Sequence, residues 1–249
     1  MPITIDDLIF TKRTSDNIDD VYNILVTCGI WMKDKYNLIH WYPPYAKEVM
    51  QDHAKKYEVY SVEIPSHILQ QYMKKSNTIE QTNVSLPDNS SQLSSTSSTK
   101  SISSSEIPST NTTTLSSPTS QSLPSSLSDD INMSSNKNIL VGTFTIGTET
   151  WVPYFRNDMW TDPNAKALYL GKLAILPIYQ GLGLAKLMLK KLDYYGKEKL
   201  CQYIRFDAIV RMPVLEPLYT SCGFQIIGRT AAPDASGTIN ELFLFEKKL

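Results

Sequence analysis

The 249-residue sequence lacks any run of about 18 apolar residues, the length that a membrane-spanning helix needs. Its first seven residues have neither the basic nor the apolar region of a secretory signal. The three cysteines, Cys28, Cys201 and Cys222, form no C-x-x-C pair, and the three histidines lack the spacing of metal ligands. We therefore expect a soluble, cytoplasmic protein with free thiols and no metal.

The sequence also lacks an excess of charge of either sign. The chain has 24 Lys and Arg against 25 Asp and Glu, a formal net charge of −1. Proteins that bind nucleic acid or anionic lipid gather a strong positive field, and this composition cannot supply one. The sequence thus predicts neither nucleic acid nor membrane as a partner.

Residues 76–137 differ in composition from the rest of the chain. Of these 62 residues, 31 are Ser or Thr, none is aromatic and seven are charged. Such a segment cannot bury enough apolar surface to offset its chain entropy. We interpret it as a disordered insert in a single domain, whose N-terminal part is residues 1–75 and whose core and C-terminal part are residues 138–249.

Hydrophobic periodicity predicts alternating strands and helices on both sides of this insert. Before it we expect a strand at Ile3–Lys12, helices at Asp16–Met32 and Pro44–Lys56, and a strand at Tyr57–Glu63. After it we expect strands at Asn138–Gly147, Ala167–Ile175 and Tyr203–Val210, helices at Gly183–Leu200 and Pro213–Cys222, and a hairpin of Phe224–Arg229 with Thr238–Lys247. Gly171 suggests a bulge in the central strand. The succession of strand, long helix and strand implies a right-handed crossover between parallel strands.

The turn between the central strand and the long helix carries the clearest chemical signal. It contains Gly181 and Gly183 just before the helix starts. Glycines let a ligand approach the backbone, and free N–H groups at the positive end of a helix favour a pyrophosphate. A Rossmann fingerprint would need a small residue where Lys186 stands, and no Walker P-loop string occurs. The segment does fit [QR]-x-x-G-x-[GA], from Gln180 to Ala185.

With this motif, the sequence resembles the GNAT superfamily of acetyl-CoA-dependent N-acetyltransferases. The likeness extends to Arg205-Phe206-Asp207 on the next strand, then to Leu218-Tyr219 and to Cys222-Gly223-Phe224. It covers 138–249 firmly and the start of the chain more loosely. The resemblance implies an α/β fold with a mixed, mostly antiparallel sheet, one splayed parallel strand pair and flanking helices. It also implies acetyl-CoA as the acyl donor.

The resemblance further implies how acetyl-CoA is held. The main chain of Leu173 and Ile175 would bond the pantetheine arm like an added strand, and the N–H groups of the glycine turn would hold the pyrophosphate. The predicted binding residues are Leu173, Ala174, Ile175, Gln180, Gly181, Leu182, Gly183, Leu184, Ala185 and Lys186.

In the family, a tyrosine at the position of Tyr219 points toward the sulfur of CoA, where it can protonate the departing thiolate. A plain packing role for Tyr219 remains the alternative. The general base is not evident, because residues 168–172 contain no acid where relatives often carry one. Glu149 is the nearest carboxylate in the predicted sheet, and water could serve instead.

Two aromatic clusters, residues 40–45 and 151–160, either cap the core or line a pocket for an amine. The lack of an acidic cluster favours a small-molecule amine over a basic polypeptide tail. The leading hypothesis is an N-acetyltransferase that works by direct attack in a ternary complex. The alternatives are a CoA-binding regulatory or scaffolding module with little or no turnover, and a nucleotide-dependent oxidoreductase. A homodimer is left open.

Overall fold

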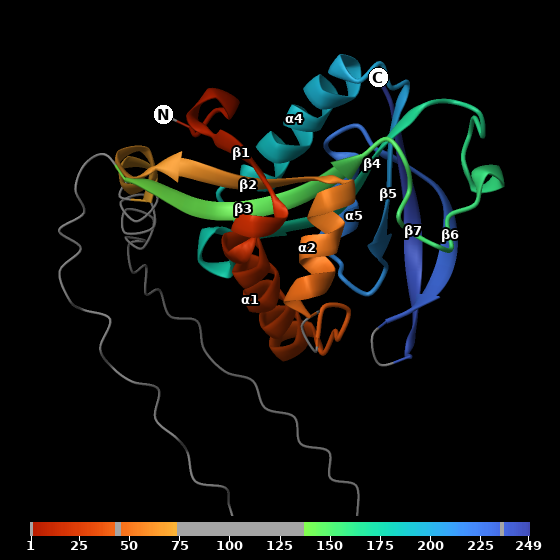
Figure 1. Ribbon diagram of the computed structural model, residues 1–249, viewed down its shortest axis with the longest axis horizontal. Helices are drawn as coiled ribbons and strands as arrows, with labels where there is room; N and C mark the ends of the chain where they lie inside the picture. The colour runs from red at the N-terminus through yellow and green to blue at the C-terminus, as the bar shows by residue number, and fades with distance from the viewer. Residues whose placement is uncertain (1, 43–45, 74–136, 235–236) are drawn as a thin grey trace, which may run out of the picture.

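The computed structural model describes residues 2–42, 46–73, 137–234 and 237–249 (Figure 1). The predicted insert therefore lies outside the described residues except for Lys137. None of the helices among the described residues is long and apolar enough to cross a membrane.

Seven strands and several helices make up the described chain. The strands are β1 (Ile9–Arg13), β2 (Glu58–Pro65), β3 (Asn138–Gly147), β4 (Ala167–Ile175), β5 (Tyr203–Ile209), β6 (Gln225–Pro233) and β7 (Ile239–Lys248). The α-helices are α1 (Asp19–Tyr36), α2 (Lys47–Lys56), α4 (Leu184–Glu198) and α5 (Leu215–Thr220), and residues 66–73 are also helical. Short 3₁₀ turns occur at Ile5–Asp7, Ser15–Asn17, Asn157–Met159 and Pro177–Tyr179.

All seven strands form one sheet in the order β1-β2-β3-β4-β5-β7-β6. The strands β2 and β3, which precede and follow the predicted insert, pair antiparallel from Glu58↔Ile146 to Pro65↔Asn138. Within the part of the chain that the structure describes, only β4 and β5 pair in parallel, and α4 connects them. This mixed, mostly antiparallel α/β sheet is the fold class that the sequence predicted. It differs from the doubly wound parallel sheet that a Rossmann oxidoreductase would require.

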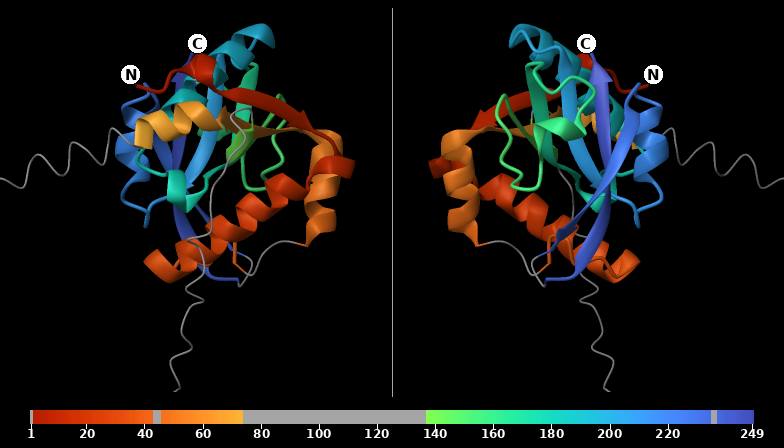
Figure 2. Two further views of the ribbon diagram at one scale, coloured as in Figure 1. Left: turned by 90° about the vertical axis from the view of Figure 1, so that its left-hand side faces the viewer. Right: turned by 90° about the vertical axis from the view of Figure 1, so that its right-hand side faces the viewer.

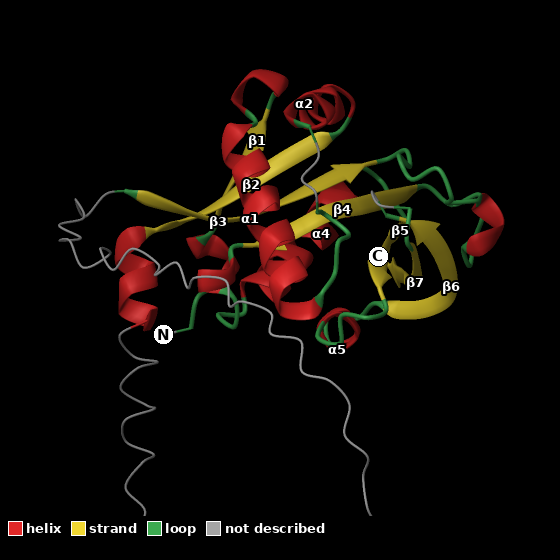
Figure 3. Ribbon diagram, turned by 90° about the horizontal axis from the view of Figure 1, so that it is seen from below, coloured by secondary structure: helices red, strands yellow, loops and turns green. Residues whose placement is uncertain are grey.

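Helices cover both faces of the sheet (Figures 2 and 3). On one face α4 packs with its apolar stripe on the largest core cluster, where Met188 and Leu192 are fully buried beside Phe144 and Phe206. On the other face α1 crosses β2, β3 and β4. Its buried residues, among them Ile24, form a second cluster with Met50 of α2. The two faces of the central strands are therefore built into separate cores.

Two predicted elements begin later than the sequence suggested. Thr4 and Asp7 close a 3₁₀ turn, in which the backbone N–H of Thr4 donates to Asp7 Oδ2 at 2.7 Å, so the first strand starts at Ile9 and not at Ile3. In the same way, the backbone N–H of Thr14 donates to Asn17 Oδ1 at 2.6 Å, and the first helix begins at Asp19 and not at Asp16. In both cases a side chain offers the backbone a local partner that competes with the regular element.

A buried ion pair joins β5 to β7. Arg205 Nε donates to Glu246 Oε1 at 2.9 Å, and both side chains are at most 5% exposed. Arg205 also donates to the carbonyl of Asp162 at 2.6 Å, which anchors the loop before β4. We expect Arg205→Ala to lower the free energy of unfolding by about 3–5 kcal/mol, because it leaves the Glu246 carboxylate buried without its partner.

A urea titration tests this expectation, with Arg229→Ala as the matched control. Arg229 pairs with Glu241 on the neighbouring β6–β7 ladder at 2.8 Å, but these side chains are 56% and 51% exposed. An exposed pair should contribute less than about 1 kcal/mol. If both variants lose the same free energy of unfolding, burial does not make the Arg205–Glu246 pair more important for stability than an exposed pair.

Candidate functional site

The parallel strands β4 and β5 part after a short paired stretch (Figure 1). Their pairing runs only from Ala167↔Tyr203 to Tyr169↔Arg205. Residues 170–175 of β4 and 206–209 of β5 have no partner across this gap, so the strands form a V that opens toward their C-terminal ends. The register between β3 and β4 also shifts between Thr143 and Thr145, where Lys172 takes a left-handed φ of 51°. The bulge expected at Gly171 is thus centred one residue later.

The glycine turn lies directly after the open part of β4. Gly181 and Gly183 have φ values of 84° and 79°, a conformation that favours glycine. A Cβ on either residue would find nothing within 4 Å, so the backbone faces open space. Among the described residues, none of the N–H groups of residues 181–185 donates to a backbone acceptor. The turn therefore presents a row of free donors at the N-terminus of the 15-residue helix α4.

The predicted binding residues on β4 do not all face the V. The N–H of Leu176 donates to the carbonyl of Val141 of β3 at 2.9 Å. Because the N–H and C=O groups of successive residues in a strand point in opposite directions, those of Ala174 face β3. The N–H and C=O groups of Leu173 and Ile175 therefore face the V. The carbonyl of Ile175 already accepts from Gln180 Nε2 at 3.1 Å and from Cys28 Sγ at 3.4 Å. Neither Gln180 nor Cys28 bonds the carbonyl of Leu173, so this carbonyl can accept a hydrogen bond from a ligand in the V.

The remaining predicted binding residues differ in how they could reach a ligand. Leu184 is 1% exposed and packs in the core, so only its N–H can take part. Leu182 and Ala185 are half-buried, and Lys186 is exposed at the start of α4. The turn thus acts through its main chain, with one cation at its rim.

Near the point where β4 and β5 part, on the face covered by α1 and α2, Lys172 and Asp207 interact electrostatically, a relation that the sequence did not reveal. Asp207 stands two residues beyond Arg205, the last paired residue of β5, and its Oδ2 accepts from the hydroxyl of Tyr154 at 2.9 Å. Burial raises the pKa of Asp207, while the Tyr154 hydrogen bond and the Lys172 charge oppose that shift. Burial lowers the pKa of Lys172 to about 8, with Asp207 opposing. This Lys172–Asp207 pair is an acid and a base whose pKa values have moved toward each other.

Aromatic and imidazole groups from both predicted aromatic clusters surround this pair. Burial lowers the pKa of His40, with Asp234 opposing the shift and Lys172 adding to it. Burial likewise lowers the pKa of His53 to about 3, again with Lys172 contributing. The ring of Trp151 covers Gly171 and lies 5.2 Å from the ring of His53. Both histidines are therefore neutral at physiological pH, and the surroundings of Lys172 disfavour positive charge.

Two polar atoms on the same face are buried without a hydrogen-bond partner among the described residues. They are His53 Nε2 and Thr145 Oγ1. Thr145 pairs with Gly171 in the sheet, against which Trp151 packs. Buried polar atoms normally have partners, so these two indicate a place where a bound molecule could donate or accept.

Tyr219 is brought to the apex of the V from the other face. It lies on α5, is 6% exposed, and packs its ring 4.7 Å from that of Phe206 and 5.0 Å from that of Phe245. Burial raises the pKa of its phenol, and the negative charge of Asp207 raises it further. The phenol is thus protonated at physiological pH, as a proton donor must be.

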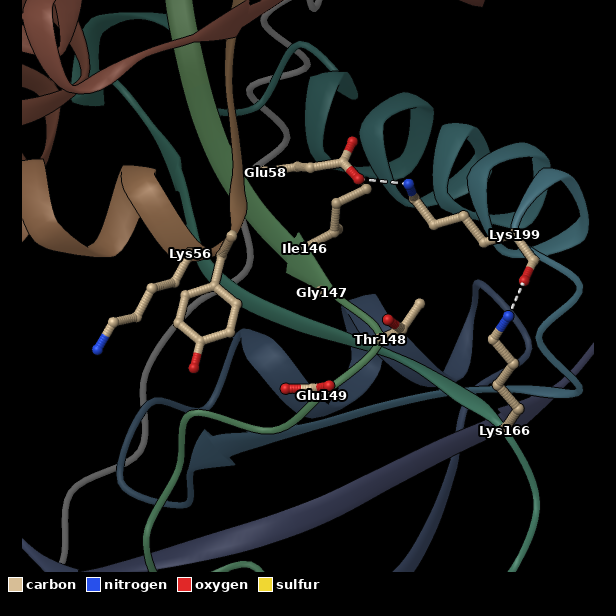
Figure 4. Close-up of a pocket in the computed structure, with 9 residues that line it drawn as sticks. Lys56, Glu58, Ile146, Gly147, Thr148, Glu149, Lys166 and Lys199 are labelled. Atoms are coloured by element: carbon tan, nitrogen blue, oxygen red, sulfur yellow. Dashed lines mark hydrogen bonds and ion pairs between the residues drawn. The ribbon is translucent and has the colours of Figure 1, made fainter.

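Glu149 lies elsewhere. It follows Gly147, which pairs with Tyr169 at the closed end of the V. There it lines a cavity of about 400 Å³ together with Glu58, Lys56, Lys166 and Lys199 (Figure 4). Of these charges, Glu58 accepts from Lys199, and it also accepts from the hydroxyl of Tyr60. Among the carboxylates of the described chain, Asp207 and not Glu149 reaches the open strands.

Comparison with known proteins identifies the fold. Neither a family model nor a curated sequence matches the chain. Among solved structures, a GNAT-family acetyltransferase of Listeria monocytogenes matches with a TM-score of 0.54 and 14% identity over 97% of this chain and 95% of that chain. NAA60 of Arabidopsis thaliana with a bisubstrate analogue matches with a TM-score of 0.52 and 12% identity over 97% and 99%. The same plant protein with acetyl-CoA matches at 0.50 and 12% over 97% and 98%.

These similarities show that the chain has the GNAT-type fold, so the resemblance in the sequence is confirmed at the level of fold. Within the described residues, no group of three or more His, Cys, Asp and Glu side chains could hold a metal ion.

Proposed function

We propose that the protein is an N-acetyltransferase that moves the acetyl group of acetyl-CoA to the primary amine of a small molecule. One observation carries the proposal: the gap between β4 and β5 is bordered by an open strand edge and by the partly buried carboxylate of Asp207, and the unpaired backbone donors of the glycine turn follow β4. The Arabidopsis structure with acetyl-CoA supports the donor, because its fold matches that of this chain. We infer that the amides of residues 181–185 hold the pyrophosphate and that the pantetheine arm runs along Leu173.

The described residues suggest a role for each proton. The amine must be neutral to attack, and Asp207 is placed to take up its proton because burial has made this carboxylate more basic. The same desolvation that lowers the pKa of Lys172 to about 8 would also favour the neutral form of an entering amine. Tyr219 then donates its proton toward the departing sulfur. The two groups act from opposite faces of the sheet, so they need not exchange a proton with each other.

The walls of the site favour a small acceptor with little positive charge. Lys172 influences the two neutral histidines electrostatically, and each of the three has a pKa lowered by burial. A strongly cationic polypeptide would bring more charge to a region that already disfavours it. Trp151 and Tyr154 instead offer apolar ring surface.

The activity is tested by incubating the protein with acetyl-CoA and each of a panel of amines and measuring the free CoA thiol that is released. Calorimetry measures acetyl-CoA binding in parallel. The proposal expects binding and amine-dependent thiol release. Tight binding without release for any amine would instead favour a CoA-binding module that has lost turnover. Absence of binding would contradict both.

We expect Tyr219→Phe to lower kcat by about tenfold or more while acetyl-CoA affinity changes little, since only the donated proton is lost. Steady-state kinetics and calorimetry on the same preparation give the two values. Tyr194→Phe, at a 59% exposed position on α4, is a matched control that should leave kcat unchanged. A Tyr219→Phe rate within about twofold of the unmodified protein would assign Tyr219 to packing alone.

A further inference from the structure

We propose that Lys172 is itself an acetyl acceptor: when no amine substrate is present, its side-chain amine takes the acetyl group of acetyl-CoA bound in the V. This inference rests on the proposed function, because it uses the same donor site.

The position of Lys172 is the first argument. Leu170, Leu173 and Ile175 of β4 belong to the core cluster beneath α4. The bulge inserts an extra residue between them, and the left-handed φ of 51° at Lys172 directs its side chain to the opposite face. There it interacts electrostatically with Asp207 of β5, with His40 in the loop before α2 and with His53 of α2.

A lysine in the left-handed region is unusual, and such conformations often mark functional positions. Here the conformation holds an amine at the point where β4 and β5 separate. Lys166 and Lys186, the lysines on either side of it in the sequence, are exposed instead. Lys166 donates to the carbonyl of Lys199 at the closed end of the V, far from the glycine turn. Lys172 is therefore distinct from its neighbours in both place and burial.

Reactivity is the second argument. An exposed lysine with a pKa near 10.4 is almost entirely protonated at neutral pH and cannot attack a thioester. Burial brings the pKa of Lys172 to about 8, so a substantial fraction of its amine is neutral at pH 8. The residue as a whole is only partly buried, so it keeps some contact with solvent.

The reaction is balanced with the groups present. The lone pair of Lys172 Nζ attacks the carbonyl carbon of the thioester, a C–N bond forms, and the C–S bond breaks with its electron pair going to sulfur. The proton lost by the amine passes to the Asp207 carboxylate, and the thiolate is protonated by Tyr219 or by water. The products are an amide on Lys172 and free CoA, with no oxidant or reductant required.

The modification would change the site. Conversion to an amide removes the positive charge that lowers the pKa of Asp207, so the pKa of that carboxyl rises further. The acid limb of the amine-dependent pH profile should then move to higher pH, and turnover at neutral pH should fall. Acetyl-CoA without acceptor would thus reduce the protein's own activity.

Peptide mapping after incubation of the full-length protein with acetyl-CoA alone tests the inference. Trypsin cannot cleave at an acetylated lysine, so modification of Lys172 replaces peptides 167–172 and 173–186 by one peptide, 167–186, that carries one acetyl group. We expect it to form at least about tenfold faster than acetylation of the exposed Lys190, because Lys172 lies beside the open part of β4 and its own pKa is lowered by burial. Lys172→Arg and urea-unfolded protein should both lack this preference.

The outcomes separate the two proposals. If acetyl-CoA binds and amines release thiol, but Lys172 is modified no faster than Lys190, this inference is wrong and the proposed function stands. If calorimetry detects no acetyl-CoA binding, both fail. If Lys172 is modified but no amine in the panel releases thiol, self-acetylation stands and transfer to a small amine is wrong.

Discussion

Gly183→Glu is expected to abolish acetyl-CoA binding. The new carboxylate would stand among the backbone donors at the start of α4, where the proposal places the pyrophosphate. Two unit charges about 4 Å apart repel each other by about 4 kcal/mol at the effective dielectric constant of a protein surface. That energy corresponds to roughly a thousandfold loss of affinity, which calorimetry would record as the disappearance of the binding heat.

The chain offers a matched control for this prediction. Gly237, in the turn between β6 and β7, has a φ of 83° and equally open surroundings. Gly237→Glu therefore introduces the same charge and the same backbone strain away from α4, and it should bind acetyl-CoA like the unmodified protein. Gly183→Ala separates strain from charge, since it keeps the strain but adds no charge. Normal affinity in Gly183→Glu would overturn the assignment of the pyrophosphate to this turn.

The glycine turn was predictable from sequence because its signal is local. Gly181 and Gly183 stand next to a strongly amphipathic helix, and their positive φ values follow from what glycine permits and other residues resist. The fold class followed for a similar reason, since strand, helix and strand in succession restrict the connection between parallel strands. The proposed base, Asp207, did not follow, because its place depends on which residues of β4 and β5 lie side by side.

Asp207 had a weak signal in the sequence that could have been used. Asp207 and Arg205 are two residues apart in a largely apolar strand, so their side chains lie on the same face. Buried charges need partners of opposite charge or hydrogen bonds, so two of them on one face mark either an ion pair or a functional site. The structure shows that the two residues differ. Arg205 pairs with Glu246, whereas Asp207 faces the V. Sequence alone could not separate them, since the pairing of β5 with β7 and the end of its pairing with β4 are both tertiary features.

Lys172 illustrates a different limit. Simple alternation along β4 would place it on the same face as Leu170, beneath α4. At the bulge, two residues of β4 oppose one residue of β3. The extra residue shifts the alternation of side chains by one position, so Lys172 lies on the opposite face. Gly171 hinted at the bulge, but no local rule predicts which neighbour takes the left-handed conformation. A one-residue change of register thus decides whether an amine lies in the core or at the site.

Asp207→Asn is expected to lower kcat/KM by about a hundredfold or more, because the amide retains the size of the carboxylate but cannot take up the proton of the amine. Acetyl-CoA affinity should be unchanged, since Asp207 lies on β5 and away from the glycine turn. Steady-state thiol release and calorimetry measure the two quantities. Asp193→Asn is the matched control, because Asp193 of α4 pairs with Lys247 of β7 and should affect neither quantity.

The stability of the same variant shows whether the loss reflects chemistry or folding. The folded-state pKa of Asp207 is raised, so its stabilising contribution is fully present below the unfolded pKa of about 3.9 and is lost as pH rises through the folded value. At neutral pH the ionised carboxylate therefore destabilises the fold, and Asp207→Asn should melt at the same temperature as the unmodified protein or higher. Activity lost together with a lower melting temperature would contradict a purely catalytic role.

The pH profile gives an independent test of Asp207 as the base. The hydroxyl of Tyr154 donates to its carboxylate at 2.9 Å and so lowers its pKa against the effect of burial. Tyr154→Phe removes this donor, so the pKa of Asp207 should rise and the acid limb of kcat/KM should move to higher pH. In Asp207→Asn that limb should vanish, leaving only the titration of the amine substrate. If Tyr154→Phe leaves the limb where it is, the proton is accepted by another group or by water, and Asp207 must act only through its charge.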